Sequence, residues 1–555
     1  MINVNRVIKD SDYLFGKNGT WRSYWQDVAR FALPTHSFIS AEKFVGQPLD
    51  LTELYDETAQ VCNLKMGGAI DYNLSNSATK WFNIQTERVE DLNDKPSEIW
   101  FNLFNDYVRY VLNNSNFDNC KQQYYPHKGC FGTAVIFTQE DDNDIVSFKL
   151  IPIEQVSLVE DAREEILAVY RQYKMTAMQA FEEFGSVVGP SILEVYQDRP
   201  YEEFEFIHYV GKRANRQTQF KDRMNMEFEG AFISKKDMHL IKETGYEEMP
   251  YSVGRFYKHP NDPFAFSPAM IAKAKTLLIN KQEQTALLRA MKEATPPTEQ
   301  PLDGYISPLD FNPHGQNFFD PMHVSPENRL RTIPFNSNFS ITLEMMNRTR
   351  DAIREAFFIP QLEVLTNITK QMTIPEVQQR IMEGMALLGP AVGRDMRETW
   401  KPTLERVARI IIRQNAPYWM IGQAGTLPPP PPSLAGKKWA VDFVSPLAKA
   451  QKTGEMNDLI NFFAIAKDVI AVQIEGAQAP AMDMLNVDEA IKEARRIKGV
   501  NPSLVNSDEV IAANRDARAQ AAQRQEQLAT AQQGAAALRD GGAGYKHLKE
   551  AEQQA

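Results

Sequence analysis

The chain has 555 residues, a formal net charge of -11 and a sequence pI of about 5.5. Hydrophobic residues make up 43% of it and aromatic residues 10%, which are values of a globular and not of a disordered protein. Because the length exceeds one ordinary core, we expect two to four structural regions. A protein that grips DNA phosphates is usually basic, so the acidic balance argues against a sequence-specific DNA reader.

The cysteines and the apolar pattern bear on the compartment. The chain has three cysteines, Cys62, Cys120 and Cys130, and their spacing is not that of metal ligands. This odd number favours free thiols in a reducing compartment. The N-terminal residues contain no continuous apolar run, so no signal peptide is predicted. No stretch approaches the roughly 18 to 20 apolar residues that span a bilayer. We expect a soluble protein made inside a cell, with no membrane partner.

The N-terminal half mixes helices and strands. Hydrophobic periodicity predicts helices at 1–35, 57–75 and 97–115 and a strand at 80–85. From 131 to 175 the period changes to two, which indicates two strand pairs around polar turns. Thr176 is expected to cap a short helix, and 201–258 contains further strands. The predicted class is therefore α+β, mainly helical.

Two long helices are predicted around an irregular tip. Ser267 is a good N-cap and Pro268 a good first helical residue, and the helix then runs without a breaker for about 40 Å. Residues 294–340 are rich in Pro, Asn, Asp and Gly, and 341–358 is helical again. The segment thus predicts a helical hairpin with a compact tip.

After a polar stretch at 359–372, residues 373–390 carry strong start and stop signals. Thr373 and Glu376 fit a capping box, and Gly389-Pro390 should stop or bend the helix. A further amphipathic helix carries Trp400, and the pentaproline 428–432 is expected to be a stiff spacer at a boundary. Beyond it lie amphipathic helices, then an Ala/Gln/Arg-rich helix from about 506 and a loose tail.

Few residues suggest catalysis. The chain has no Walker A loop, dinucleotide fingerprint or nucleophile elbow. The histidines are scattered without ligand spacing: His36, His127, His208, His239, His259, His314, His323 and His547. The acidic run "EDDND" (Glu140, Asp141, Asp142 and Asp144) is the one tempting metal site, but Asp and Asn also favour hairpin turns, the reading we prefer. No cofactor is expected.

Four stretches, in order and spacing, resemble the portal, or head-to-tail connector, proteins of short-tailed bacteriophages. They are "YDETAQVCNLKMGGAI…SATKWFNI", "EEILAVYRQYKMTAMQAFEEFG", "YSVGRFYKHPNDPFAFSPAM" leading to "ATPP", and "TIPEVQQRIMEGMALLGP" followed by "RETWKPTLERVARIIIRQ" and "VDFVSPLAKAQK". The likeness covers about residues 50–515. One departure is Phe264-Ala265-Phe266-Ser267-Pro268, where the family has Tyr-Gly-Arg-Ser-Pro.

The resemblance implies the phage portal fold (wing, stem, clip and crown) and a homo-oligomeric ring of, typically, twelve subunits around a central channel. The implied regions are the N-terminal α/β wing 1–266, the first stem helix 267–293, the clip 294–340, the second stem helix 341–358, the tunnel loop 359–372, the wing helices with the Pro-rich linker 373–440, the crown 441–515, and an Ala/Gln-rich helix or tail 516–555.

The resemblance also implies partners: double-stranded DNA bound without sequence specificity, a terminase packaging motor, a tail adaptor, capsid and scaffolding proteins, and internal core proteins. Such a protein is no enzyme; it is made in the bacterial cytoplasm and lies at the virion's head-tail vertex. Candidate channel residues are Lys370, Thr369, Gln371, Lys281, Arg289 and Arg354. Candidate clip residues for motor and adaptor docking are Asp303, Asp310, Asp320 and Glu327.

Two other readings stay open. A metal-dependent nuclease could use the "EDDND" carboxylates, and a non-viral scaffold could be built from the amphipathic helices. The basic residues of 268–294 fit phosphate contacts, but they equally fit a solvated or subunit-interface face paired with Glu283 and Glu293. Native mass separates these readings, because only the portal reading requires a large ring.

Overall fold

The computed structural model describes residues 2–39, 53–87, 95–141, 143–216, 222–294, 298–299, 318, 322, 331–332, 339–366, 389–414, 428–434, 436–444, 510–525 and 527–528. Two compact units are distinguished by their internal contacts. The first comprises residues 1–83, 106–427 and 441–458, and the second comprises 84–105, 428–440 and 459–555.

The helices and strands follow the α+β class that the sequence predicts. The helices are α1 (Val4–Lys17), α2 (Gly19–Ala32), α3 (Thr58–Leu74), α4 (Lys95–Asn114), α5 (Phe117–Phe131), α6 (Ala177–Phe184), α7 (Pro190–Tyr196), α8 (Pro268–Ala294), α9 (Phe339–Ala356), α10 (Ile359–Thr366), the π-helix η7 (Met396–Trp400) and α12 (Lys401–Gln414). The strands are β1 (Phe82–Thr86), β2 (Thr133–Asp141), β3 (Ile145–Ile151), β4 (Val156–Glu160), β5 (Ile166–Thr176), β6 (Glu203–Lys212), β7 (Phe228–Ser234), β8 (His239–Tyr246), β9 (Tyr251–Arg255), β10 (Tyr257–Lys258), β11 (Ala265–Phe266), β12 (Thr298–Glu299), β13 (Arg331–Thr332) and β14 (Trp439–Phe443).

The single helix predicted at 1–35 is wrong, because the chain forms two helices there. Asn18 ends α1 and precedes α2, and its side chain donates to Ser157 Oγ at 3.0 Å. Asn and Gly have low helix propensity, so Asn18-Gly19 is the weakest point of the segment. The end of this region is as predicted, since Pro34 lies just beyond α2 and opens a short 3-10 helix.

A five-stranded antiparallel sheet, ordered β4-β5-β6-β7-β8, is covered on both faces. Alternate residues of a strand point to opposite faces, so the neighbours Phe206 and Ile207 enter different cores. Ile207 packs with Val7 and Phe15 of α1, and Phe206 packs with residues of α6 and α7. Helix α6 begins with a capping box between Thr176 and Gln179, at the N-cap that the sequence predicts.

A smaller antiparallel sheet, ordered β3-β2-β9, contacts α5 and α12. Helix α5 was not predicted from the sequence. Its buried residues include Lys121, His127 and Lys128, while Asn119, Gln122 and Gln123 are exposed. Because polar residues are buried together with apolar ones, residue type does not alternate with the helical period that the sequence analysis relied on. It also packs against α3 and α8.

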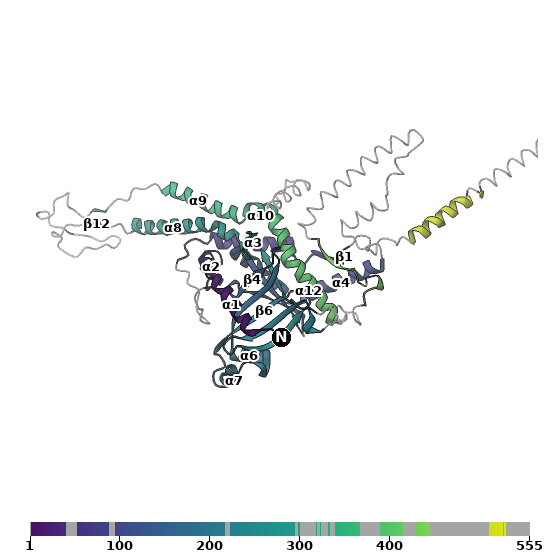
Figure 1. Ribbon diagram of the computed structural model, residues 1–555. Coiled ribbons are helices and arrows are strands. Elements are labelled where there is room, and N and C mark those ends of the chain that lie inside the picture. Colours follow the sequence, from purple (N-terminus) through teal and green to yellow (C-terminus); the bar gives the residue numbers. More distant parts are fainter. Residues whose placement is uncertain are drawn as a thin grey trace, which may run out of the picture. The chain divides into compact units, whose positions relative to one another are not determined.

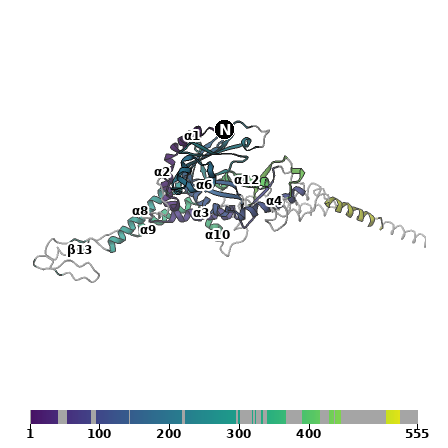
Figure 2. The same ribbon diagram turned by 90° about the horizontal axis from the view of Figure 1, so that it is seen from below.

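Helices α8 and α9 form the predicted hairpin and lie side by side in both views (Figure 1, Figure 2). Each of the two helices begins and ends within a few residues of its predicted bounds. Between them, β12 pairs with β13 in a two-residue antiparallel ladder. The buried residues of α8 all lie between Pro268 and Ile279, so its second half leaves the core.

The polar stretch 359–372 is not a loop throughout. Residues Ile359–Thr366 form α10, and Ile359 and Leu362 are buried as α10 contacts α3 and α9. Their apolar spacing within a short run explains the helix. Residues 367–372 and the capping box of Thr373 and Glu376 lie outside the described residues. Gly389-Pro390 begins a described helical stretch, 389–395, that leads into η7 and α12.

In the second unit, the Pro-rich segment is tied to the first half of α4. The indole N–H of Trp100 donates to the Pro428 carbonyl at 2.7 Å, and the hydroxyls of Ser97 and Ser433 lie 2.9 Å apart. Trp439 packs on Trp100 with ring centroids 5.5 Å apart. Residues 510–525 are helical, within the predicted Ala/Gln/Arg-rich region. Among the described helices, none has the length and hydropathy of a membrane span.

Candidate functional site: the α8–α9 hairpin and the 389–400 anchor

The first turn of α8 is fixed to the end of α5 by directional bonds. Ser267 Oγ donates to the Cys130 carbonyl at 2.7 Å and accepts from the Met270 N–H at 2.9 Å, as expected of an N-cap. Gly132, with φ of 74°, ends α5, and a Cβ there would lie 2.1 Å from the Ala265 carbonyl oxygen. The hairpin therefore leaves the core from a rigid base.

The two hairpin helices are held together by a small core and one charged cluster. Ile279 of α8 and Ile353 of α9 are fully buried. Arg350 of α9 pairs with Glu283 of α8 and, at 3.0 Å, with Asp56 just before α3. Since Asp56 is almost completely buried, removing Arg350 would leave a buried carboxylate without its ion-pair partner, which is costly.

Helix α8 carries large apolar side chains on its surface, most of them in its outer half. Leu277, Leu287, Leu288 and Met291 are 44%, 49%, 52% and 58% exposed, and we call these four residues the α8 apolar face. Successive residues of an α-helix are 100° apart around its axis, and by this geometry the four side chains fall within one arc of about 100°. An apolar surface of this kind typically marks an interaction site.

The predicted channel residues that the structure describes all lie on the hairpin. Lys281 is exposed and donates to Gln284 Oε1 at 2.7 Å; Arg289 pairs with Glu293 at 2.9 Å, and Arg354 with Asp351 at 3.8 Å. Exposed pairs within one helix, such as that of Arg354, contribute little and can exchange for other partners, whereas the Arg289 side chain is only 19% exposed. Lys370, Thr369 and Gln371 lie outside the described residues. So do the predicted clip residues Asp303, Asp310, Asp320 and Glu327.

The "EDDND" run forms the turn between β2 and β3. Asp141 Oδ1 accepts the backbone N–H groups of Asn143 at 2.8 Å and Asp144 at 3.1 Å, while Glu140 pairs with Arg413 at 3.0 Å. Asp142 is not among the described residues. Of those that are, no three His, Cys, Asp or Glu side chains converge as metal ligands would. The local bonds are those of an Asx turn.

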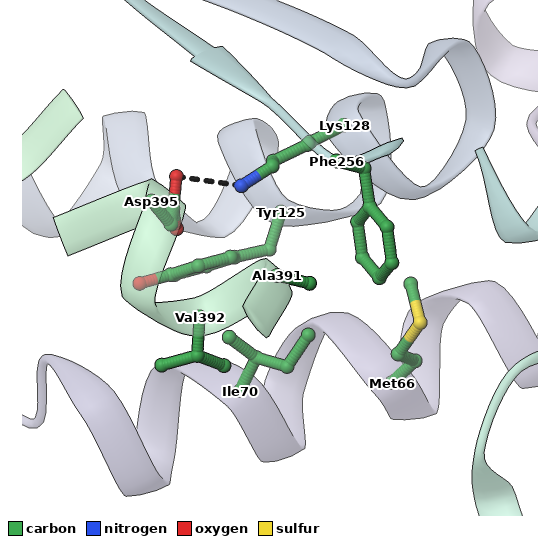
Figure 3. A pocket seen from close by; sticks show the side chains of 8 residues that line it. All are labelled: Met66, Ile70, Tyr125, Lys128, Phe256, Ala391, Val392 and Asp395. Atoms are coloured by element: carbon green, nitrogen blue, oxygen red, sulfur yellow. Dashed lines mark ion pairs between the residues drawn. The ribbon is translucent and has the colours of Figure 1, made fainter. Parts of the chain in front are cut away.

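A buried ionic cluster fixes the helical stretch 389–395 to α5. The Lys128 ammonium lies 2.7 Å from Asp395 Oδ1, with side chains only 5% and 2% exposed, and the two face each other in Figure 3. The Tyr124 hydroxyl donates to the same carboxylate at 2.5 Å, and Thr399 Oγ1 donates at 3.0 Å. Burial first, and then the Asp395 charge, hold the pKa of Tyr124 well above its usual value. No sequence pattern indicated this cluster.

The space beside this cluster is small. A cavity of about 10 Å³ lies between the α3 residues Met66 and Ile70, Phe256, and Ala391 and Val392 of the stretch 389–395 (Figure 3). This volume is near the minimum for one water molecule, so the place is a packed joint and not a ligand pocket.

A second ionic cluster fixes η7 to the strands. The Arg255 guanidinium of β9 makes two parallel bonds of 2.9 Å to the Glu398 carboxylate and also pairs with Glu160 of β4. Glu160 is shared with Lys258 at 3.1 Å. The pKa of Arg255 is raised, because its bonds and attraction to Glu398 and Glu160 outweigh the desolvation that lowers it. The cluster thus joins β4, β9, β10 and η7.

A larger crevice, of about 590 Å³, lies between α6, β8 and α12. Arg406 and Arg413 line it, but both are already paired with Glu248, and Arg413 also with Glu140. Carboxylates of the same chain therefore already neutralise both guanidinium groups, so these two arginines do not predict an anionic ligand in the crevice.

The family relationship agrees with this geometry of anchored helices. The family model described as bacteriophage head to tail connecting protein matches residues 5–505. The chain belongs to this family. It is 26% identical over 546 residues to the portal protein of Salmonella phage epsilon15, covering 95% of this chain and 93% of that protein. It is 23% identical over 523 residues to the probable portal protein of Bordetella phage BPP-1, covering 93% and 91%.

The predicted family and portal function are thus confirmed. As a connector, the chain is a structural protein by kinship, and the nuclease and cellular-scaffold readings are not favoured. Among the described residues, the hairpin carries the exposed α8 apolar face, and the two ionic clusters hold α5, the strands and η7 together.

Proposed function

We propose that this connector assembles as a closed ring of identical subunits at the head-tail vertex of a virion, around a channel through which double-stranded DNA passes. The observation that carries the ring is the α8 apolar face, which a monomer leaves in water although α8 is firmly fixed at its base. A neighbouring subunit that covers this face removes its apolar area from water. In a ring the contact is heterologous, so it must close after a fixed rotation.

The described elements suggest how the ring divides. Helices α8 and α9 are proposed as the stem, and the region between them, with β12 and β13, as the clip that meets the terminase motor and later the tail adaptor. The two sheets and α12 would form the wing, and 441–515 the crown inside the head. The tunnel loop would lie between the end of α10 and residue 372.

Lys281, Arg289 and Arg354 are proposed to brake DNA in the stem, together with Lys370, Thr369 and Gln371 of the tunnel loop. Lys281 is exposed and Arg354 is held only by a 3.8 Å pair with Asp351, and a basic ring in an otherwise acidic protein can slow the duplex without gripping it. Removing the charge with Lys281→Gln and Arg354→Gln should lower DNA retention in filled heads. Unchanged packaging and retention in both variants would remove these residues from the channel.

Imaging of the purified full-length chain by electron microscopy tests the ring directly. We expect a ring with a central hole, twelve subunits as the family resemblance implies, and a native mass that is a multiple of 63.2 kDa. A monomer or dimer at micromolar concentration would overturn the proposal. Capsid, scaffolding and internal core proteins are proposed as further partners, to be found by co-purification from infected cells.

A further inference from the structure

The helix that contains residues 389–414 changes its winding at one place. In η7 the N–H of Lys401 bonds to the carbonyl of Met396, five residues back and not four. A π turn of this kind holds one residue more than a regular α-helix needs, and such turns are rare and occur mostly where they have a use. Regular α-helix resumes in α12.

The segment downstream of the extra residue is fixed by directional bonds. Thr403 Oγ1 donates to the Thr399 carbonyl at 2.6 Å, and the Thr403 and Ser252 hydroxyl oxygens lie 2.8 Å apart. Glu398 is held by the two parallel bonds from Arg255, and Trp400 is fully buried. Helix α12 therefore has one register only against the sheet β3-β2-β9.

The upstream segment is held differently. Ala391 and Val392 rest on Met66 and Ile70 through apolar contacts, which have no preferred direction (Figure 3). A Cβ on Gly389 or Gly393 would meet nothing within 4 Å. The directional side-chain bonds described for residues 389–395 end on Asp395 and come from Lys128, Tyr124 and Thr399.

We propose that η7 is a one-residue register joint, locked by the bonds of Asp395 to Lys128 and Tyr124. When these bonds open, the extra residue can pass out of the helix. Residues 389–395 then turn by about 100° and shift by about 1.5 Å relative to α12, the values of one α-helical residue. The joint is a property of the fold and does not depend on the ring. Its consequence is that the chain entering at Gly389 has two possible orientations against a fixed wing helix.

Two variants with opposite expected effects test the joint. In the released variant, Lys128→Met with Asp395→Leu, both charges are removed together so that neither is left buried alone. In the locked variant, Arg397 is deleted; it is the exposed residue of η7, and its loss allows a regular α-helix with Asp395 still in its site. The matched control, Lys401→Met, breaks only the half-exposed pair with Glu405 on the same helix.

The measurement is hydrogen exchange of backbone amides in the full-length assembled protein, with α12 as internal reference. We expect exchange in 389–396 to become about tenfold faster in the released variant and about tenfold slower in the locked variant, with α12 unchanged. The control should match wild type. A cryo-EM map of the released variant should show Lys401 bonded to the Arg397 carbonyl.

Equal exchange of 389–396 in the released, locked and wild-type proteins would overturn the joint. So would a released variant that keeps the bond from Lys401 to Met396. If the released variant does not fold, the locked variant decides alone: exchange no slower than wild type, or failure of the deletion to fold, shows that the extra residue is part of a static packing.

Discussion

Replacing the α8 apolar face with polar residues should weaken assembly and leave the subunit folded. The variant is Leu277→Gln, Leu287→Gln, Leu288→Gln and Met291→Gln. Glutamine keeps high helix propensity, so the helix itself is little affected. Because these side chains are about half exposed, their loss should cost the isolated subunit little stability.

The size of the effect follows from the exposed fractions. Fully burying a Leu or Met side chain is worth about 1.5–3 kcal/mol, so covering the exposed half contributes about 1 kcal/mol for each residue. Four such residues contribute about 4 kcal/mol at each subunit contact, a factor of about 1,000 in the association constant. Changing only Leu277 and Leu288 should give about a thirtyfold effect by the same reasoning.

Assembly can be followed by mass photometry or sedimentation over a range of protein concentrations. We expect the concentration at half-assembly to rise about thirtyfold in the double variant and much further in the quadruple variant. The control is Lys275→Gln with Ala290→Gln, two exposed α8 positions outside the apolar face. Circular dichroism confirms folding. If the quadruple variant assembles at the wild-type concentration, the apolar face is no subunit contact.

Three further outcomes are expected. Ser267→Ala should lower the free energy of unfolding by about 1–2 kcal/mol in denaturant titrations, because it removes the α8 N-cap and leaves the Cys130 carbonyl unpaired. Burial lowers the pKa of His127 and His208 well below the usual value. As pH falls, these histidines are therefore protonated in the unfolded chain at a higher pH than in the folded chain. Stability should therefore fall as pH drops below about 6.5, by up to about 1.4 kcal/mol per pH unit for each histidine, and His127→Phe should flatten the curve. Burial raises the pKa of Cys62 to about 11 and of Cys120 to about 12, so alkylation at pH 8 should require unfolding, as mass spectrometry can show.

Local signals in the sequence identified α6, α8 and the strands β2 to β5. Ser267-Pro268 marked the start of α8, Thr176 marked α6, and period-two runs marked β2 to β5, because caps and amphipathic periods depend only on near neighbours. Helix α5 lacked such a signal since its polar residues are buried as well as its apolar ones. The break at Asn18 was missed because both flanking helices share one continuous helical pattern.

The buried clusters could not be predicted in this way. Arg255 and Glu398 are 143 residues apart, and Tyr124 and Asp395 are 271 apart. Each is an ordinary residue in its own segment, and only the packing of α5, β9 and η7 brings the partners together. The sequence contained the charges but no signal of which charges would meet.

The chain buries two charged clusters and exposes an apolar face on α8, and the proposed ring gives a reason for both. A buried ion pair adds little net stability, but its bonds have direction, so they set register and angle. An apolar face adds affinity without direction. In a closed ring each heterologous contact must turn by the same angle, and an error in one subunit recurs in every other. In the proposed ring the two requirements would be met by different parts of the subunit. The clusters of Asp395 and Arg255 would set the angle by holding the body of the subunit, and the α8 apolar face would supply affinity for the neighbouring subunit.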